Sequence, residues 1–311
     1  MKKRTIFLSF SLGQTSVSDF FLELAYNFSI ENQVVIFSDR ILPESIQIPK
    51  NTKIFYWPST RPTKIKDAYF LFKNILRYKP AMVISNFGSV NIFTLISFIC
   101  LVKHRIAWVH TISTQFDSKK VFRFRKSLVY KLCTNIVTNS FATKQDVIDV
   151  FNVNKKKIFV IYNSLNITNT PSSPTEIENI TYVGRLHKSK GVTILLDAFA
   201  IVLKELPSLK LNFIGNGPEL EMLKEQCRLL KIESNVNFLG SLSKAEVLCS
   251  FKKSFCAVIP SFSEAFGYTV IEAMSEKTCV IGANNTGIKE IIIDNETGLL
   301  FDTGNVKHLA S

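Results

Sequence analysis

Residues 260–274 of the chain read PSFSEAFGYTVIEAM, and this stretch carries the clearest pattern in the sequence. A short apolar run typical of a buried strand precedes it, and its second half has the apolar spacing of a helix. Gly267 permits a tight loop between the two, and the backbone amides that open a helix favour anions. Glu264 in the loop and Glu272 one turn into the helix can accept hydroxyl groups of a sugar and a ribose. Two glutamates eight residues apart are also common on solvated surfaces, so the strand and loop around them give the pattern its weight.

A second loop of the same kind occupies residues 184–191, which read GRLHKSKG between another predicted strand and helix. Gly184 lets the backbone approach a ligand closely. Arg185 and Lys190 place two cations near a helix N-terminus, which already favours negative charge. The loop therefore predicts a site for a diphosphate, with a basic solvent-facing loop as the alternative.

Short apolar runs alternate with helix-period segments on both sides of residues 166–178, a polar stretch that contains two prolines. This alternation is typical of right-handed βαβ units and parallel sheets. It predicts an α/β protein with two doubly wound, Rossmann-like domains over residues 1–165 and 179–311 and a linker over 166–178. Ligands of such sheets bind at the carboxyl ends of the strands.

The 311 residues carry 38 Lys and Arg against 25 Asp and Glu, and 46% of them are hydrophobic. This composition allows two packed domains and excludes a disordered chain. Residues 1–170 hold 24 basic and 9 acidic residues, whereas residues 171–311 hold 14 and 16. The basic half is typical of a protein with a polyanionic partner, nucleic acid or an anionic membrane, although solubility alone is the alternative.

Several functional classes are disfavoured. The six cysteines form no CxxC pair, and no nearby histidine gives them the spacing of metal ligands, so no metal site is expected. Residues 215–217, GNG, lack the third glycine of a dinucleotide fingerprint, and there is no P-loop and no Gly-x-Ser-x-Gly elbow. The longest apolar run, residues 90–102, is too short to cross a bilayer and predicts a buried helix.

Taken in order, these motifs resemble the family 4 retaining glycosyltransferases, the glycosyl transferases group 1 family, whose members have the GT-B fold of two such domains facing a central cleft. The second half carries the diagnostic segments: 184–186 with 190–191, 215–218, 237–240, the Glu-x7-Glu pattern of 264–272, and 287–292 with 297–300. The first half is more weakly similar, at 11–14, 108–110, 136–140 and 161–164.

The resemblance implies that Arg185 and Lys190 neutralise the donor diphosphate as the glycosidic bond breaks, with no metal ion or cofactor. It also implies that Glu264 lies beside the donor sugar, that Glu272 holds the ribose, and that His110 reaches the sugar. A structural role is the commoner one for a lone histidine. The remaining implied donor contacts are made by backbone: Gly13, Gly184, Phe266, Gly267, Tyr268 and Thr269.

The implied enzyme is a hexosyltransferase that moves a sugar, with retention, from a nucleotide sugar to a glycan or lipid-linked acceptor. Cell-surface polysaccharide synthesis (lipopolysaccharide, capsule or exopolysaccharide) is the expected pathway. Gln14 and Ala265 depart from the family pattern, and the chain stops at Ser311, where family members usually continue for some tens of residues. The second domain is therefore expected to be incomplete. The alternative function is a truncated, non-catalytic relative that binds a nucleotide sugar or serves as a scaffold.

Residues 119–131, KKVFRFRKSLVYK, place cations and aromatics at helical spacing. A basic amphipathic helix can lie in a membrane interface. We expect a cytoplasmic protein that binds the inner face of the plasma membrane peripherally; an ordinary helix packed on the sheet is the alternative. No nucleic-acid recognition module is present, so nucleic acid is not expected. The residues expected to face the membrane are Lys119, Lys120, Arg123, Arg125 and Lys126.

Overall fold

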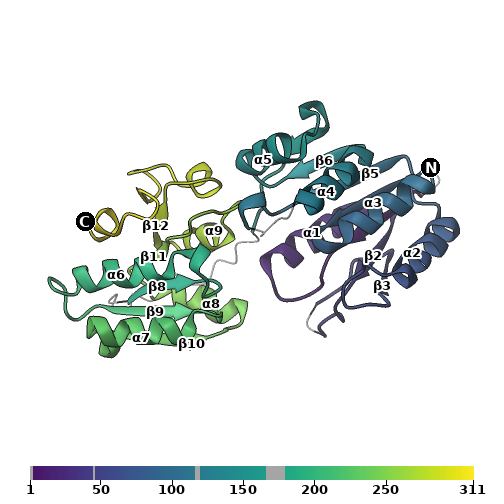
Figure 1. Cartoon of the computed structure of the whole chain (residues 1–311). Helices are drawn as coiled ribbons and strands as arrows, with labels where there is room; N and C mark the ends of the chain where they lie inside the picture. Colours follow the sequence, from purple (N-terminus) through teal and green to yellow (C-terminus); the bar gives the residue numbers. More distant parts are fainter. Residues whose placement is uncertain (1–2, 45, 116–119, 166–178) are drawn as a thin grey trace. The chain divides into compact units, whose positions relative to one another are not determined.

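The computed structural model describes residues 3–44, 46–115, 120–165 and 179–311 (Figure 1). The chain forms two compact units, Met1–Leu165 and Asn166–Ser311, called unit 1 and unit 2 below. The linker expected at 166–178 lies outside the described residues, as does Lys119.

Unit 1 is built on a parallel sheet of seven strands in the order β3-β2-β1-β4-β5-β6-β7. The strand order reverses between β1 and β4, which is where open parallel sheets bind ligands. The strands are β1 (Thr5–Ser9), β2 (Gln33–Ser38), β3 (Thr52–Tyr56), β4 (Met82–Asn86), β5 (His104–Val109), β6 (Asn135–Thr138) and β7 (Ile158–Val160). The helices between them are α1 (Ser16–Ser29), α2 (Ile65–Tyr78), α3 (Val90–Ile99), α4 (Lys120–Leu132) and α5 (Phe141–Phe151).

Much of the chain's phenylalanine fills the core of unit 1. Strand side chains alternate between the two faces of a sheet, so each face of this sheet has its own apolar layer. Phe10, Phe21 and Trp108 belong to one layer. Phe37 and Trp57 belong to another, with their ring centroids 5.4 Å apart. These layers fix the strand ends from which the loops of unit 1 leave.

Unit 2 has a parallel sheet of six strands in the order β10-β9-β8-β11-β12-β13, with the reversal between β8 and β11. Its strands are β8 (Asn179–Val183), β9 (Lys210–Ile214), β10 (Val236–Gly240), β11 (Cys256–Ile259), β12 (Cys279–Ala283) and β13 (Leu299–Phe301). Its helices are α6 (Val192–Val202), α7 (Leu220–Leu230), α8 (Lys244–Lys252), α9 (Tyr268–Ser275) and α10 (Val306–Ala310). The prediction of two doubly wound α/β units is confirmed.

The helix predicted over 90–102 ends early. Helix α3 stops at Ile99, where the amide of Cys100 bonds to the carbonyl of Ile96, and Leu101 adopts the left-handed φ of 56°. The apolar run continues past this point because Val102 is buried on its way into the next strand. In the described part of the chain, no helix has both the length and the apolar character needed to span a bilayer.

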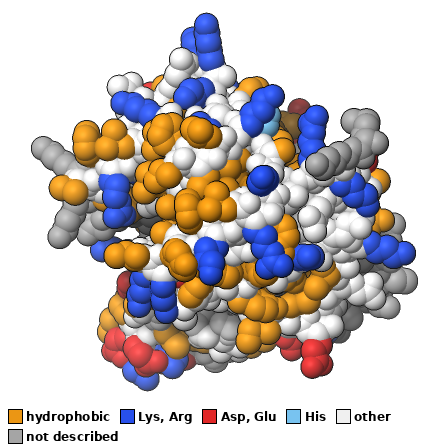
Figure 2. All heavy atoms as spheres, turned by 90° about the vertical axis from the view of Figure 1, so that its right-hand side faces the viewer, with side chains coloured by type: hydrophobic (Ala, Val, Ile, Leu, Met, Phe, Trp, Pro, Cys, Tyr) orange, Lys and Arg blue, Asp and Glu red, His pale blue; other side chains and the backbone are white. Residues whose placement is uncertain are grey.

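Helices α2, α3 and α4 pack side by side in that order on unit 1. Figure 2 looks onto the side of unit 1 that bears α2 and α3, and it shows hydrophobic side chains interspersed with Lys and Arg. Leu101 is 86% exposed and Phe124, on α4, is 67% exposed. The sequence of these three helices contains one acidic residue, Asp67, and it is buried.

Candidate functional site

The loops that follow β8 and β9 meet through their main chains. A Cβ atom at Gly215 would lie 2.0 Å from the carbonyl oxygen of Gly184, and one at Gly217 would lie 2.0 Å from that of Leu186. The amide of Leu186 donates a 3.0 Å hydrogen bond to the carbonyl of Asn216. Only glycine fits such contacts, so these glycines position one loop on the other.

The loop after β8 is also held to the loop after β11. Gly191 has a φ of 67°, and a Cβ there would lie 2.0 Å from the carbonyl oxygen of Pro260. The amide of Phe262 donates a 3.0 Å bond to the carbonyl of Ser189. As a result the GRLHKSKG and PSFSEAFGY segments form one surface at the carboxyl edge of the sheet.

Lys190 and Glu264 form an ion pair on this surface. Ser261 donates a 3.0 Å hydrogen bond from its hydroxyl to Oε1 of Glu264, the oxygen that also accepts from Lys190. The main chain of Glu264 is fixed as well, because its amide donates to Oγ1 of Thr286 at 2.9 Å and its carbonyl accepts from the amide of Gly287 at 2.9 Å. The carboxylate is therefore held in place before any ligand arrives.

Arg185 supplies a second cation to the same surface. The hydroxyl of the buried Tyr182 donates a 2.9 Å bond to the carbonyl of Arg185. Burial, and then the negative charge of Glu264, raise the pKa of the Tyr182 phenol, so the carboxylate lies near this ring. The guanidinium of Arg185 is exposed, and no described residue bonds to it. Its charge is available to an anion, whereas that of Lys190 is offset by Glu264.

Helix α9 begins at the end of the second loop. Gly267, with a φ of 107°, caps it, and Tyr268 and Thr269 are its first residues. The N-terminus of a helix carries partial positive charge and favours phosphate. Phe266 is buried behind the cap, with its ring 5.6 Å from that of Tyr268. Glu272 lies half-buried on the same helix, so the structure brings this part of the predicted donor site together.

His110 follows β5 at the carboxyl edge of the unit 1 sheet and is 8% exposed. Neither of its ring nitrogens has a hydrogen-bond partner among the described residues. Burial lowers the pKa of this imidazole to about 3, so the ring is neutral at pH 7. The Phe87 ring stacks on the imidazole at a centroid distance of 5.0 Å.

Gly13, the other predicted residue of unit 1, lies in the loop after β1, where its amide donates a 3.1 Å bond to Oγ of Ser18. A Cβ there would lie no nearer than 3.8 Å to Arg40, an ordinary contact. Local packing therefore does not explain the glycine.

The cations of α4 do not all point to solvent. Arg123 and Arg125 are exposed, whereas Lys126 is half-buried with its ammonium 5.6 Å from the ring centroid of Tyr130 and 5.9 Å from that of Phe151. Burial lowers the pKa of Lys126, and the nearby Asp146 acts in the opposite direction. For Lys126, packing against the protein fits better than a position facing a membrane.

Lys120 is the first residue of the helix, and its side chain lies outside the description.

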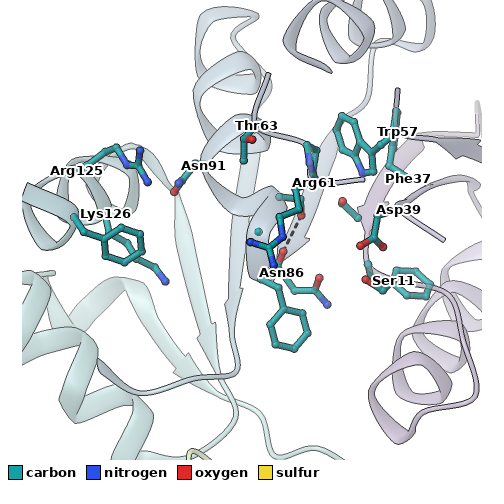
Figure 3. A pocket seen from close by; sticks show the side chains of 17 residues that line it. Ser11, Phe37, Asp39, Trp57, Arg61, Thr63, Asn86, Asn91, Arg125 and Lys126 are labelled. Carbon is teal, nitrogen blue, oxygen red and sulfur yellow. Dashed lines mark hydrogen bonds between the residues drawn. The ribbon is translucent and has the colours of Figure 1, made fainter. Parts of the chain in front are cut away.

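A pocket in unit 1 contains residues that sequence reasoning missed (Figure 3). Asp39, Trp57 and Asn86 line it from positions at or just after the ends of β2, β3 and β4, and Arg61 comes from the next loop. No single motif joins them because they come from separate segments. The available signal was a polar or aromatic residue at each predicted strand end. No group of three or more His, Cys, Asp or Glu side chains suited to a metal gathers within the described ranges.

Two family models match the chain, Glycosyltransferase Family 4 over residues 24–169 and Glycosyl transferases group 1 over residues 165–311. The chain belongs to the family 4 glycosyltransferases. In this family 4 chain the Glycosyl transferases group 1 match covers the unit 2 loops described above. The Glycosyltransferase Family 4 match covers His110 and the unit 1 pocket except for Ser9, Phe10 and Ser11.

Curated relatives are similar to this family 4 chain over part of their length. An uncharacterized glycosyltransferase of Haemophilus influenzae is 27% identical over 224 residues, which is 71% of this chain and 62% of the relative. The O-antigen chain mannosyltransferase RfbU of Salmonella typhimurium is 27% identical over 200 residues, 62% of this chain and 55% of the relative. The matched region thus spans about half to three fifths of these relatives.

Solved structures are similar over nearly the whole chain. Anabaena HepE in complex with UDP has a TM-score of 0.81 at 19% identity and covers 99% of this chain and 88% of its own. The lipopolysaccharide outer core galactosyltransferase WaaB has a TM-score of 0.72 at 20% identity, with 99% and 89% covered. These likenesses establish the GT-B fold.

Proposed function

We propose that this family 4 chain is a retaining glycosyltransferase that takes its sugar from a nucleotide-sugar donor. The Lys190–Glu264 ion pair carries the proposal, because it joins a cation and a sugar-binding carboxylate where the N-terminus of α9 also lies. A diphosphate needs positive charge and a sugar needs hydrogen-bond acceptors, and this surface offers both. HepE, a protein of the same fold, was solved with UDP and with UDP-glucose, so UDP-sugars are the first donors to test.

In the proposed reaction the bond between the anomeric carbon and the diphosphate oxygen breaks, and a bond from that carbon to an acceptor oxygen forms on the same face. Negative charge develops on the leaving diphosphate, where Arg185, Lys190 and the N-terminus of α9 stabilise it. The acceptor hydroxyl loses its proton to a phosphate oxygen of the leaving group. These groups supply the required charge from this chain's own residues.

His110 is proposed to bind the transferred sugar as a neutral imidazole. A neutral imidazole has one nitrogen that donates and one that accepts, which matches a sugar hydroxyl. Burial keeps the pKa of His110 at about 3, so the ring does not change charge between pH 5 and 8. Neither ring nitrogen has a partner among the described residues, so a sugar hydroxyl would supply a hydrogen bond that the buried imidazole lacks.

The proposed pathway is assembly of a cell-surface polysaccharide, with a glycan or lipid-linked acceptor. The named activities of two similar proteins, an O-antigen mannosyltransferase and a lipopolysaccharide outer core galactosyltransferase, support it. A third relative, the alpha-monoglucosyldiacylglycerol synthase of Streptococcus pneumoniae, is 34% identical over 119 residues and is named for a lipid product.

Release of nucleoside diphosphate from a panel of nucleotide sugars, with membrane extract as acceptor, tests this function. We expect release with one donor class and its loss, by at least a hundredfold, in Glu264→Gln and Lys190→Met. Lys188→Ala is the matched control, since Lys188 lies in the same turn with its side chain exposed. No release with any donor favours the non-catalytic alternative, and equal release from all these variants contradicts the assignment of the site.

We also propose that the α2–α3–α4 face of unit 1 binds an anionic membrane. Its exposed apolar side chains can enter the interface while its cations contact lipid phosphates. Lys73 on α2 and Lys103 after α3 are exposed, and Asp67, the acidic residue of these helices, is buried. The positive charge of this face therefore favours an anionic bilayer over an uncharged, apolar binding partner.

Sedimentation with phosphatidylglycerol-containing and pure phosphatidylcholine vesicles tests the membrane proposal. We expect binding to the anionic vesicles that falls at least tenfold in the double variant Lys73→Glu/Lys103→Glu, because each basic residue contributes about 1 kcal/mol at such a surface. The control Lys204→Glu/Lys307→Glu changes the same charge on exposed positions of unit 2. Equal binding to both vesicles, or binding to neither, contradicts it.

A further inference from the structure

A pocket of about 390 Å³ lies at the carboxyl ends of β1 to β4, and all its described lining residues belong to unit 1. Figure 3 shows Arg61 and Asn86 in its middle, Trp57 and Asp39 to one side, and Arg125 to the other. It sits where the strand order reverses between β1 and β4, the usual ligand position in an open parallel sheet.

The buried side chain of Asn86 indicates that this pocket binds a ligand. The residue is 2% exposed, and its Nδ2 amide group donates to no described residue. A buried donor without an acceptor is unfavourable, because it has given up its hydrogen bonds to water and gained none in return. Phe87, the next residue, has a φ of 45°, which is unfavourable for a bulky side chain. An unpaired donor beside a strained residue is typical of a binding site, and here the missing partner is an acceptor atom such as an oxygen.

The charge of the pocket indicates which kind of chemical group carries this acceptor oxygen. Of its described lining residues, Asp39 carries a carboxylate, whereas Arg61, Arg125 and Lys126 carry cations. Arg61 comes from the loop between β3 and α2, and Arg125 comes from α4 across the pocket. The excess of two positive charges favours a ligand that brings negative charge with it. Arginine pairs well with both phosphate and carboxylate.

The pocket also has an aromatic wall. Trp57 is 8% exposed and packs on Phe37 and Phe93, which fixes the orientation of its ring. An apolar wall with a few convergent polar groups is typical of a pocket that binds a small molecule. A sugar or an isoprenoid unit attached to the anion can rest on this wall.

We propose that this pocket binds the acceptor substrate through an oxyanion, a phosphate or a carboxylate, held by Arg61, Arg125 and the Nδ2 group of Asn86. The assignment rests on the proposed function, which puts the donor nucleotide on the loops of unit 2 and so leaves this unit 1 pocket for the acceptor. The acceptor is accordingly an acidic molecule: a sugar on a lipid diphosphate or a glycan that ends near an acidic sugar.

Trp57 allows a direct binding measurement. The chain contains two tryptophans, so Trp108→Phe leaves Trp57 as the reporter in the pocket. Emission is followed during titration with four probes in the absence of any donor: glucose 1-phosphate, methyl glucuronide, geranyl diphosphate and the neutral methyl glucoside. We expect at least one anionic probe to change the emission at a concentration at least tenfold below that of methyl glucoside.

The pattern of responses separates the two sources of the anion. A response to geranyl diphosphate and glucose 1-phosphate without methyl glucuronide assigns the phosphate of a lipid carrier, and the reverse pattern assigns an acidic sugar. In both cases Arg61→Gln and Arg125→Gln should each raise the half-saturating concentration about tenfold, the loss expected for one charge-assisted hydrogen bond. Arg123→Gln, on the same helix but outside the lining, should leave it unchanged.

Three outcomes overturn the proposal: equal responses to anionic and neutral probes, no response to any of the four, or an anionic response that both arginine variants retain. None of them bears on donor use, because no donor is present in the titration. Release of nucleoside diphosphate continues to test the proposed function separately.

Discussion

The phenyl ring of Phe87 lies stacked on the imidazole of His110, with centroids 5.0 Å apart and planes inclined by 22°. Phe87 reaches this position through a left-handed backbone, with a φ of 45°. It is itself 49% exposed, so it covers the imidazole from the solvent side. The strained Phe87 therefore contributes to the burial that keeps His110 neutral, together with the rings of Phe21 and Trp108.

Removing this cover should raise the pKa of His110. In Phe87→Ala, water reaches the ring, so the desolvation that lowers the pKa to about 3 is reduced and the value moves toward the ordinary 6.5. The chain has four histidines, and the ring Cε1–H signals in NMR spectra follow each one through pH. Phe159→Ala, which truncates an exposed ring on β7, is the control. An unchanged His110 titration in Phe87→Ala would show that other residues maintain its burial.

His110 should make the stability of unit 1 depend on pH. Its folded pKa of about 3 lies below the ordinary value of 6.5, so the unfolded state binds the proton more readily between these two values. The stability is therefore fully present above pH 6.5 and is lost as pH falls toward 3. At pH 5 the expected loss from this group is about 2 kcal/mol.

Urea unfolding followed by tryptophan fluorescence measures this effect, because Trp57 and Trp108 both belong to unit 1. We expect His110→Gln to lose less stability between pH 7 and pH 5 than the unmodified chain. His104→Gln, at the opposite end of β5, should lose as much as the unmodified chain. Parallel losses in all three proteins would contradict the assignment to His110.

Two glycines with nearly the same φ allow the cost of backbone strain to be separated from the cost of a steric clash. Gly191 has a φ of 67° and Gly240 one of 69°, but a Cβ at Gly240 would meet nothing within 4 Å, whereas one at Gly191 would lie 2.0 Å from Pro260. Gly240→Ala should cost about 1 kcal/mol, the conformational penalty alone. Gly191→Ala should cost clearly more, or displace Lys190 and abolish nucleoside diphosphate release. Thermal unfolding by circular dichroism compares the two variants, and equal midpoints would contradict the close contact.

The two members of the Lys190–Glu264 pair should respond differently to nucleoside diphosphate. Lys190→Met removes a cation and should weaken UDP binding at least tenfold, since it also leaves Glu264 unpaired nearby. Glu264→Gln frees the ammonium of Lys190, so UDP should bind at least as tightly while sugar transfer falls. Calorimetric titration with UDP checks both. Weaker UDP binding in Glu264→Gln would mean that this carboxylate does not face the sugar.

The strand–helix alternation of the sequence predicted the parallel sheets of both units because buried strands and amphipathic helices leave different apolar periods. The unit 2 loops of the proposed donor site could be picked out from the sequence, since glycines, cations and glutamates there lie close together. The pairing of Lys190 with Glu264 was not, because 74 positions separate them. The unit 1 pocket was missed for the same reason: Asp39, Trp57 and Asn86 meet only when parallel strands bring their ends to one edge.

The environment of single side chains was also beyond the sequence. The sequence of residues 119–131 predicts a helix with cations on its solvent side, but Lys126 packs over the rings of Tyr130 and Phe151. Likewise, the amino-acid sequence around Leu101 does not show that this residue adopts a left-handed backbone conformation where α3 ends. Both outcomes depend on neighbours contributed by other segments, which a local pattern does not contain.

Because Gly184 and Gly215 touch through main-chain atoms, the frame of the first two unit 2 loops is independent of the side chains mounted on it. The bond from Leu186 to Asn216 likewise uses only the carbonyl of Asn216, whose side chain is exposed. Substituting Asn216 and its side-chain partner Ser241 would thus change the side chains at the edge of the proposed donor surface while keeping the main-chain contacts between the loops. A small library at these two positions is a practical starting point for changing which sugar the proposed donor site accepts.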